Sequence, residues 1–411
     1  MSKRAFITVA EVSGDNNAAS LARALLRLDP SIRIEGLGGP AMAAEGVRVH
    51  FETTTRAAMT FHAAGRVREV WRWLKWMKAE YSRDKPDLHI CVDSSGFNLH
   101  FAKVAKSFGV PVLYYVAPQL WASREGRIKK VRASVDRVAS IFPFEAEWYR
   151  QRGVNAEFVG HPLFDALPAT RLELGSHPPR FPDRPPVIGI VPGSRKSEVK
   201  ENWPSLLQVM EKVSAAFPGA EFLVPATQNA LPALLGRAGP AEGNVPRVYH
   251  VSEQFGAAGD RLERPIKYCI EVDSFDRLIP QCDLVLCKSG TSTVHVAAYG
   301  VPMIVVYRVN RVLWHGAGRW LVKTKKIAMV NILAGQTDAV PEFIPWYGPV
   351  NAVANCAIDL LNHPEKLTAQ RQRLIEIIEP ISKPGASMNV AKMAMEMIGR
   401  PAMQVDMELS L

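Results

Sequence analysis

The chain has 411 residues, which is long for one hydrophobic core and predicts two domains. Hydrophobic residues make up 47% of it and charged residues 22%, and no segment approaches the roughly 18 apolar residues of a bilayer-spanning helix, so we expect no membrane span. The net charge of +10 indicates an anionic partner, namely nucleic acid, a nucleotide sugar or acidic lipid, and because no common nucleic-acid-binding motif is present we expect no nucleic acid partner.

Short apolar runs alternate with helical patterns from the first residues onward, which predicts βαβ units on a parallel sheet. In chain order, the expected strand and helix pairs are residues 6–10 and 18–28, 88–92 and 98–108, and 112–116 and 124–133. Six prolines and a lack of periodicity indicate a linker at residues 168–186. The pattern then restarts, with expected strands at 187–191, 221–225, 283–287 and 303–307, a helix at 203–217, and two or three helices after residue 349.

These elements predict an α/β fold of two Rossmann-like domains that face a cleft, because open α/β sheets bind ligands at the carboxyl ends of their strands. The expected divisions are an amino-terminal domain at residues 1–167, the linker at 168–186, a carboxyl-terminal domain at 187–365, and helices with a tail at 366–411. Residues 236–265 are rich in glycine, proline and charge and are expected to form an irregular loop.

Cysteine and histidine spacing gives no sign of a metal site. The five cysteines include no CxxC pair, and His161 and His295 have no partner at a metal-ligand spacing. We therefore expect no disulfide framework, no metal and no cofactor.

Two polar turns follow expected strands in the second half of the chain. Gly193 permits a tight turn, and Ser194 and Arg195 lie near the start of the next helix, where backbone N–H groups and an arginine attract phosphate. A similar turn opens another helix at Ser289, Gly290 and Thr291. Together the turns predict a site for a diphosphate and its nucleoside, and the alternative for each turn alone is an ordinary capped helix start.

Two acidic residues follow expected strands in the first half of the chain. Glu11 follows the first strand and Asp93 follows the apolar strand at 88–92, so both are expected to face the cleft. Asp93 is a candidate general base that takes a proton from an attacking hydroxyl, and the alternative is that it caps the next helix. For Ser13 and Asp15, which follow Glu11, a helix cap is the simpler interpretation.

Residues 66–85 combine a helical apolar stripe with tryptophans and seven basic residues. The stripe alone is typical of a helix packed on the core. However, Trp73 lies at its margin and Trp76 nearly opposite, which favours an interfacial helix at anionic lipid headgroups. The expected lipid contacts are Trp71, Trp73, Trp76, Arg72 and Lys75. A second basic and aromatic stretch, residues 308–326 with Trp314 and Trp320, has similar chemistry, but for it the core interpretation is favoured.

An ordered set of motifs extends from about residue 6 to about residue 359. They are AEVSGD (10–15), LGGPAM (37–42), VDSSGFN (92–98), VPGSR (191–195), CKSGTSTVHVA (287–297) and VNILAGQTDAVPEF (330–343), with further segments at 115–121, 141–145 and 158–163. This set resembles the signature of lipid A disaccharide synthases, which are membrane-surface glycosyltransferases. The resemblance implies the GT-B fold and transfer of 2,3-diacylglucosamine from UDP-2,3-diacylglucosamine to 2,3-diacylglucosamine 1-phosphate in a β-1,6 linkage, with UDP released. It also implies a peripheral location on the cytoplasmic face of the inner membrane.

The resemblance carries roles to particular residues. It implies that Asp93 is the base, that Arg195 and Asn331 lie in the active site, and that Glu11, with Ser13 and Gly14, belongs to an amino-terminal site loop. The residues implied to contact the UDP-sugar are Gly193, Ser194, Arg195, Ser289, Gly290, Thr291 and His295.

The chain departs from the family pattern at three places. His295 stands where the family has a glutamate expected near the nucleotide, Gly96 replaces a second acid, and residues 59–64 differ from the family's MGxxEV. Two alternatives follow from these departures. One is a related UDP-sugar enzyme with a different acceptor, and the other is a lipid or nucleotide-sugar binding protein whose chemistry has lapsed.

Overall fold

The computed structural model describes residues 3–54, 63–174, 183–235, 247–250, 266–308 and 324–399. Several predicted segments lie outside these ranges: most of the second basic and aromatic stretch, including Trp314 and Trp320, residues 59–62, most of residues 236–265 and the tail after Gly399. The chain divides into two compact units: residues 1–166 with 381–411 form unit 1, and residues 167–380 form unit 2.

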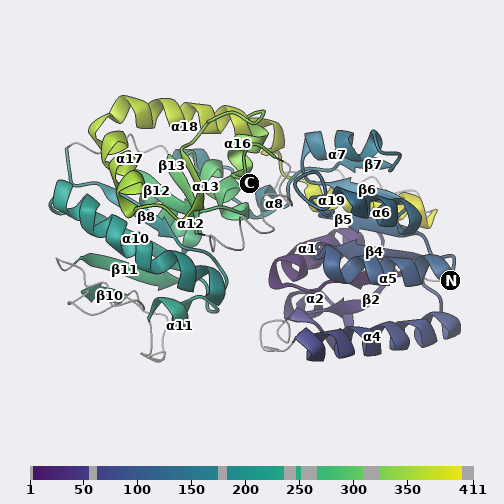
Figure 1. Ribbon diagram of the computed structural model, residues 1–411. Helices are drawn as coiled ribbons and strands as arrows, with labels where there is room; N and C mark the ends of the chain where they lie inside the picture. The colour runs from purple at the N-terminus through teal and green to yellow at the C-terminus, as the bar shows by residue number, and fades with distance from the viewer. Residues whose placement is uncertain are drawn as a thin grey trace. The chain divides into compact units, whose positions relative to one another are not determined.

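Unit 1 is built on a seven-stranded parallel sheet in the order β3-β2-β1-β4-β5-β6-β7 (Figure 1). Its strands are β1 (Arg4–Thr8), β2 (Arg33–Gly38), β3 (Arg48–Glu52), β4 (Leu88–Val92), β5 (Val112–Tyr115), β6 (Arg137–Ser140) and β7 (Ala156–Phe158). Its helices are α1 (Val12–Leu28), α2 (Pro40–Ala44), α4 (Ala63–Arg83), α5 (Ser95–Ser107), α6 (Ile128–Ser134), α7 (Pro143–Arg150), α8 (Leu163–Ala166) and α19 (Ala386–Ile398). The strands β1, β4 and β5 are buried along their whole length, as expected where helices cover both faces of a parallel sheet.

Unit 2 repeats this plan with the order β10-β11-β9-β8-β12-β13-β14, in which β10 pairs antiparallel with β11. Its strands are β8 (Val187–Val191), β9 (Glu221–Ala226), β10 (Arg247–His250), β11 (Lys267–Val272), β12 (Leu284–Lys288), β13 (Met303–Arg308) and β14 (Glu342–Trp346). Its helices are α9 (Arg171–Leu174), α10 (Lys196–Ala216), α11 (Leu231–Leu234), α12 (Phe275–Leu278), α13 (Thr291–Ala298), α16 (Met329–Leu333), α17 (Val350–Asn362) and α18 (Pro364–Ile378).

The predicted α/β fold class is confirmed, and all seven strands expected from apolar runs are present. The first helix begins at Val12 instead of residue 18, because Gly14 and Asp15 are buried in its first turn. The helices expected after residue 349 are α17, α18 and α19. The last of them returns to unit 1 and packs on α1, so that yellow α19 lies among the blue elements of that unit in Figure 1.

In each sheet the chain order reverses between two central neighbouring strands. In unit 1 these are β1 and β4, where Thr8 lies beside Cys91, and in unit 2 they are β8 and β12, where Val191 lies beside Cys287. Such reversals open a crevice at the carboxyl ends of the strands, which is where α/β proteins bind ligands. Each unit therefore has one preferred edge for a site.

Candidate active site

Asp93 lies at the carboxyl end of β4, on the turn that leads into α5. Asp93 and Ser94 have φ angles of 56° and 43°, in the left-handed region that residues other than glycine seldom adopt. Val116, directly after the neighbouring strand β5, has a φ of 53°. Such strained backbone persists only where the surrounding structure holds it, and it concentrates at functional sites. This edge is the strongest candidate in unit 1.

Buried side chains fix the backbone of the turn. Asn98 Nδ2 donates to the carbonyl oxygens of Val92 and Asp93, both at 2.8 Å, and the Tyr114 hydroxyl donates to the same Asp93 carbonyl at 2.8 Å. The Asp93 carboxylate accepts a hydrogen bond from the Ser94 N–H at 2.6 Å, and Ser94 is itself the N-cap of α5. The N-cap position of α5 thus belongs to Ser94 and not to Asp93.

The loop after β1 approaches Asp93 from the adjacent strand. Glu11 is the N-cap of α1, and Ser13 and Gly14 lie in its first turn. A Cβ on Gly14 would lie 2.7 Å from Val9 Cγ1, so glycine is what lets the first turn of α1 pack on Val9, and the same point lies at an ordinary contact distance of 3.5 Å from Asp93 Cβ. The predicted loop and the predicted base are thus brought together where the strand order reverses.

Asp15 caps a different helix from the one we expected. Its buried carboxylate accepts hydrogen bonds at the start of α2 from the N–H groups of Gly39 (2.9 Å), Ala41 (2.9 Å) and Met42 (3.3 Å). Its interpretation as a cap of α1 was wrong, because the side chain turns toward the LGGPAM segment instead. Hydrogen bonds therefore link the AEVSGD and LGGPAM segments.

The predicted phosphate turn after β8 holds a carboxylate of its own chain. Gly193 has a φ of 130°, and Arg195 is the N-cap of α10. The N–H groups of Ser194 and Arg195 donate to Glu198 Oε2 at 3.3 and 3.4 Å, and Lys288 Nζ, from the end of β12, donates to Oε1 at 2.9 Å. Burial alone would raise the pKa of Glu198, but Lys288 and Arg195 outweigh it and lower the pKa, so the carboxylate is ionised at neutral pH. The turn therefore suits an anion.

Glu198 and Lys288 were not among the predicted site residues. A glutamate three positions after an N-cap is typical of a capping box, and this spacing is the signal that was available in the sequence. The Arg195 side chain is 64% exposed, and its guanidinium lies 3.5 Å from Glu198 Oε1. It can therefore reach a ligand at the same turn.

The second polar turn is partly used within unit 2. The Ser289 N–H donates to the Val306 carbonyl at 3.0 Å, and its hydroxyl donates to the Ile327 carbonyl at 3.4 Å. Ser289 thus holds the turn in place. Gly290, with a φ of 153°, precedes exposed Thr291, the first residue of α13, and these two form the outward part of the turn.

His295 faces the neighbouring helix α12. Its Nε2 lies 2.5 Å from Asp276 Oδ1, its ring stacks on Phe275 at 4.3 Å, and the Tyr299 hydroxyl donates to the same Asp276 oxygen at 3.0 Å. The hydrogen bond from His295 is the main reason that the pKa of Asp276 is lowered. A carboxylate therefore lies beside the position where the family motif has a glutamate. The sequence around residue 295 gives no sign that Asp276 is its partner, because Asp276 lies on a different helix, α12.

The side-chain amide of Asn331 is held by hydrogen bonds within unit 2. It is buried, its Nδ2 donates to the Val340 carbonyl at 3.1 Å and to Glu342 Oε2 at 3.0 Å, and its Oδ1 accepts from the Val340 N–H at 2.9 Å. Glu342 also accepts hydrogen bonds from the N–H groups of Ile327 and Ala328 at the start of α16. The Asn331 amide therefore holds the segment from Asn331 to Glu342 together, and its place in the active site stays a prediction.

A family model described as lipid-A-disaccharide synthetase matches residues 5–242 and 247–395. The chain belongs to this family. Relatives named lipid-A-disaccharide synthase support the assignment over nearly the whole length. The one from Geobacter metallireducens is 32% identical over 405 residues, covering 97% of this chain and 98% of the relative, and the one from Trichlorobacter lovleyi is 34% identical over 400 residues, covering 96% and 98%. The resemblance drawn from the motifs is confirmed.

Solved structures similar to this lipid-A-disaccharide synthase family member confirm the GT-B fold. A UDP-GlcNAc 2-epimerase from Neisseria meningitidis bound to UDP-GlcNAc matches with a TM-score of 0.60 at 10% identity, covering 96% of this chain and all of that one. The glycosyltransferase of kitacinnamycin matches with a TM-score of 0.57 at 14% identity, covering 97% and 100%. At these identities the likeness concerns the fold alone.

In this family member, α4 exposes only part of the predicted set of lipid contacts, namely Trp71, Arg72 and Lys75. Trp73 is 4% exposed and packs edge-on against Phe97, and Trp76 is half-buried against Phe51, whereas Trp71 is 66% exposed. The expectation that Trp73 contacts lipid is therefore wrong. The outward face consists of Val67, Arg68, Trp71, Arg72, Lys75 and Lys78, and we call it the α4 surface. No helix in the described ranges is long and apolar enough to cross a membrane.

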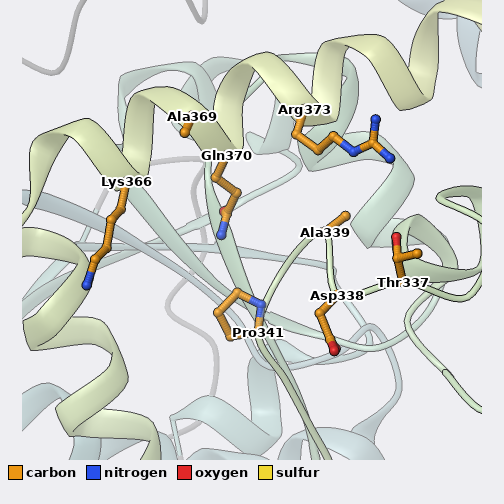
Figure 2. A pocket seen from close by; sticks show the side chains of 8 residues that line it. All are labelled: Thr337, Asp338, Ala339, Pro341, Lys366, Ala369, Gln370 and Arg373. Carbon is orange, nitrogen blue, oxygen red and sulfur yellow. The ribbon is translucent and has the colours of Figure 1, made fainter.

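A shallow pocket on unit 2 contains none of the predicted site residues. It lies between the loop before β14 and helix α18, and Figure 2 shows Lys366, Gln370 and Arg373 of α18 on one side and Asp338 and Pro341 of the loop on the other. Within the described part of the chain, no three His, Cys, Asp or Glu side chains come together as a metal site.

Proposed function

We propose that the chain transfers 2,3-diacylglucosamine from UDP-2,3-diacylglucosamine to the primary hydroxyl of 2,3-diacylglucosamine 1-phosphate, with Asp93 as the general base. As a member of the lipid-A-disaccharide synthase family, the chain is a glycosyltransferase. The observation that carries the assignment of the base is the strained turn at Asp93, held by buried donors at the strand reversal of unit 1.

In the proposed reaction, Asp93 takes the proton of the acceptor hydroxyl as its oxygen attacks the anomeric carbon of the donor sugar. The attack comes from the face opposite UDP. The bond between the new oxygen and that carbon forms as the bond to the diphosphate oxygen breaks, which inverts the centre and gives the β linkage. The departing UDP carries the negative charge that develops in the transition state, so donors that bind this charge accelerate the step.

The turns after β8 and β12 support the proposal for the donor. The N–H groups of Ser194 and Arg195, the Arg195 guanidinium and, from the end of β12, Lys288 Nζ already bind the carboxylate of Glu198, so an anionic group suits the geometry. We propose that the diphosphate takes the place of that carboxylate and that Arg195 binds its oxygens. Asp276, held by His295, then places a carboxylate near the nucleoside. This is the role expected of the family's glutamate.

Two of the three departures from the family pattern, Gly96 and His295, are compatible with an active enzyme. At Gly96, no described heavy atom lies within 4 Å of the point that a Cβ would occupy, so the missing acid leaves the Asp93 turn intact. At His295, the hydrogen-bonded Asp276 supplies a carboxylate next to the position of the family's glutamate. These observations favour the synthase over a lapsed binding protein.

The test of the function is an assay of the purified protein in detergent micelles with the two diacylated substrates, measuring UDP release and disaccharide formation. We expect both products in equal amounts. A folded protein that binds UDP and forms no disaccharide would overturn the proposal, and product from other acceptors only would indicate a related UDP-sugar enzyme.

Replacement of Arg195 tests the donor site. Arg195→Ala removes a charge-assisted contact to the diphosphate, and we expect the Kd for UDP, measured by calorimetry, to rise about tenfold. Arg373→Ala is the matched control, because Arg373 is an equally charged, exposed residue that lines the pocket in Figure 2. An unchanged Kd in Arg195→Ala, or a raised one in the control, would place the nucleotide elsewhere.

We also propose that the α4 surface binds anionic lipid headgroups and so holds the protein at the cytoplasmic face of the inner membrane, where its acylated substrates reside. Val67 is 70% exposed and Trp71 66% exposed, and Lys75 Nζ lies 6.0 Å from the Trp71 ring centre. Exposed tryptophan flanked by basic side chains is typical of helices at the membrane interface.

Loss of two charges tests this surface. Each basic residue near an anionic bilayer contributes about 1 kcal/mol, so Arg72→Gln with Lys75→Gln should weaken vesicle binding by about thirtyfold. The measurement is co-sedimentation with vesicles that contain anionic phospholipid. Lys129→Gln with Lys130→Gln on α6 removes the same charge from another exposed surface of unit 1 and should have little effect. Equal losses in the two double variants would show that net charge alone is responsible.

A further inference from the structure

Behind the Asp93 turn, four buried side chains form a continuous line of hydrogen bonds. The Tyr81 hydroxyl lies 2.7 Å from His89 Nδ1, His89 Nε2 lies 3.1 Å from Thr8 Oγ1, and Thr8 Oγ1 lies 2.7 Å from Asn98 Oδ1. Asn98 then donates to the carbonyl of Asp93. Tyr81 is 2% exposed and the other three are fully buried, on α4, β4, β1 and α5 respectively.

With a neutral His89 ring, only one arrangement of protons satisfies this line. The carbonyls of Val92 and Asp93 can only accept, so both hydrogens of the Asn98 amide nitrogen go to them, and Asn98 Oδ1 faces Thr8. The Thr8 hydroxyl must therefore donate to Asn98 and accept from His89 Nε2–H. The neutral His89 ring, with its hydrogen on Nε2, has a bare Nδ1, which accepts the hydrogen of Tyr81. Burial lowers the pKa of His89 to about 3, in agreement with a neutral ring.

We infer that Thr8, His89 and Tyr81 are positioning residues that fix the orientation of Asn98 and through it the left-handed turn that carries Asp93. A turn with φ angles of 56° and 43° at two residues other than glycine relaxes unless its carbonyls are held. Asn98 can hold both carbonyls only in one amide orientation, and Thr8 selects that orientation. This inference rests on the proposed role of Asp93 as base.

The decisive variant is Thr8→Val, which keeps the shape of the side chain and removes the hydroxyl. Because a small misplacement of a catalytic group costs up to about a hundredfold, we expect kcat to fall about tenfold or more, with KM for the donor unchanged. Thr8→Ser restores the hydroxyl and should restore kcat. Tyr81→Phe, at the far end of the line, should have a smaller effect.

The control for a general loss of stability is Val138→Ala, a truncation in the same buried core. Loss of kcat in this variant equal to that in Thr8→Val, normal kcat in Thr8→Val, or no rescue by serine would each overturn the inference.

Wild-type protein and Asp93→Asn are measured in the same assay, which separates the two proposals. A wild type that forms no disaccharide refutes the proposed function. The positioning role is then decided by a crystal structure of Thr8→Val, in which Asp93 should leave the left-handed region, and a turn unchanged from that of the wild type would refute it. If the wild type is active and Asp93→Asn is not, a normal kcat in Thr8→Val refutes the positioning role alone.

Discussion

Asp93→Asn should lower the rate of disaccharide formation by about a hundredfold or more, because an amide cannot take the proton of the acceptor hydroxyl. The variant keeps the size of the side chain and an oxygen that can accept the Ser94 N–H bond now made by the carboxylate. We expect UDP to bind as before, since the proposed donor site lies in unit 2. The measurements are initial rates in micelles and UDP binding by calorimetry.

The matched control is Asp87→Asn, at the opposite end of the same strand. Asp87 accepts hydrogen bonds from the Arg4 N–H at 2.8 Å and from Lys3 Nζ at 3.2 Å, so it ties the amino ends of β1 and β4 together. Its loss should affect stability more than rate. An Asp93→Asn enzyme with more than about a tenth of the wild-type rate would exclude Asp93 as the base.

Glu145→Gln should make unit 1 more stable above neutral pH. Glu145 is fully buried on α7, where Trp121 Nε1 donates to Oε1 at 3.0 Å and the Ser140 hydroxyl donates to Oε2 at 2.5 Å. Burial raises its pKa from 4.5 to about 7, although these hydrogen bonds oppose the shift. Between these values the folded protein binds a proton that the unfolded chain releases, so the free energy of unfolding falls as pH rises through this window.

The size of the effect is on the order of 3 kcal/mol, present below about pH 4.5 and lost above about pH 7. Glutamine is neutral at every pH and should abolish this slope, so the variant should exceed the wild type in stability at pH 8 and not at pH 5. Urea unfolding at the two pH values measures the difference. Glu147→Gln, on the exposed side of the same helix, should keep the slope of the wild type. A slope that persists in Glu145→Gln would mean that another group causes it.

The parts of the fold that the sequence predicts are those with long apolar strands. β4 and β8 are central, covered on both faces and therefore unbroken in hydrophobic character. By contrast, β3 is half-exposed and β7 has only three residues, so neither forms a distinct apolar run. Edge strands and short strands form because they pair with a neighbouring strand, here β2 or β6, and their own residues give little sign of that pairing.

The candidate site divides in the same way. The turns at Asp93 and Gly193 were predictable, since each directly follows a central strand at the edge where ligands bind. The partners of Asp15 and His295 were not, because Gly39 and Asp276 reach them from other elements. The three tryptophans of α4 lie on different sides of the helix. The pattern therefore placed Trp73 on the exposed side, whereas it is buried.

The return of α19 to unit 1 has a consequence for synthesis on the ribosome. Asp165 accepts hydrogen bonds at the start of α19 from Gly385, Ala386 and Ser387, and Asn389 Nδ2 donates to the Val159 carbonyl. The first 166 residues emerge long before these partners do. Unit 1 must therefore wait, with the face of α1 that α19 covers still open, until residues 386–398 have been translated. Chains that stop before α19 should be captured by chaperones or degraded, although they contain the turns at Asp93 and Gly193.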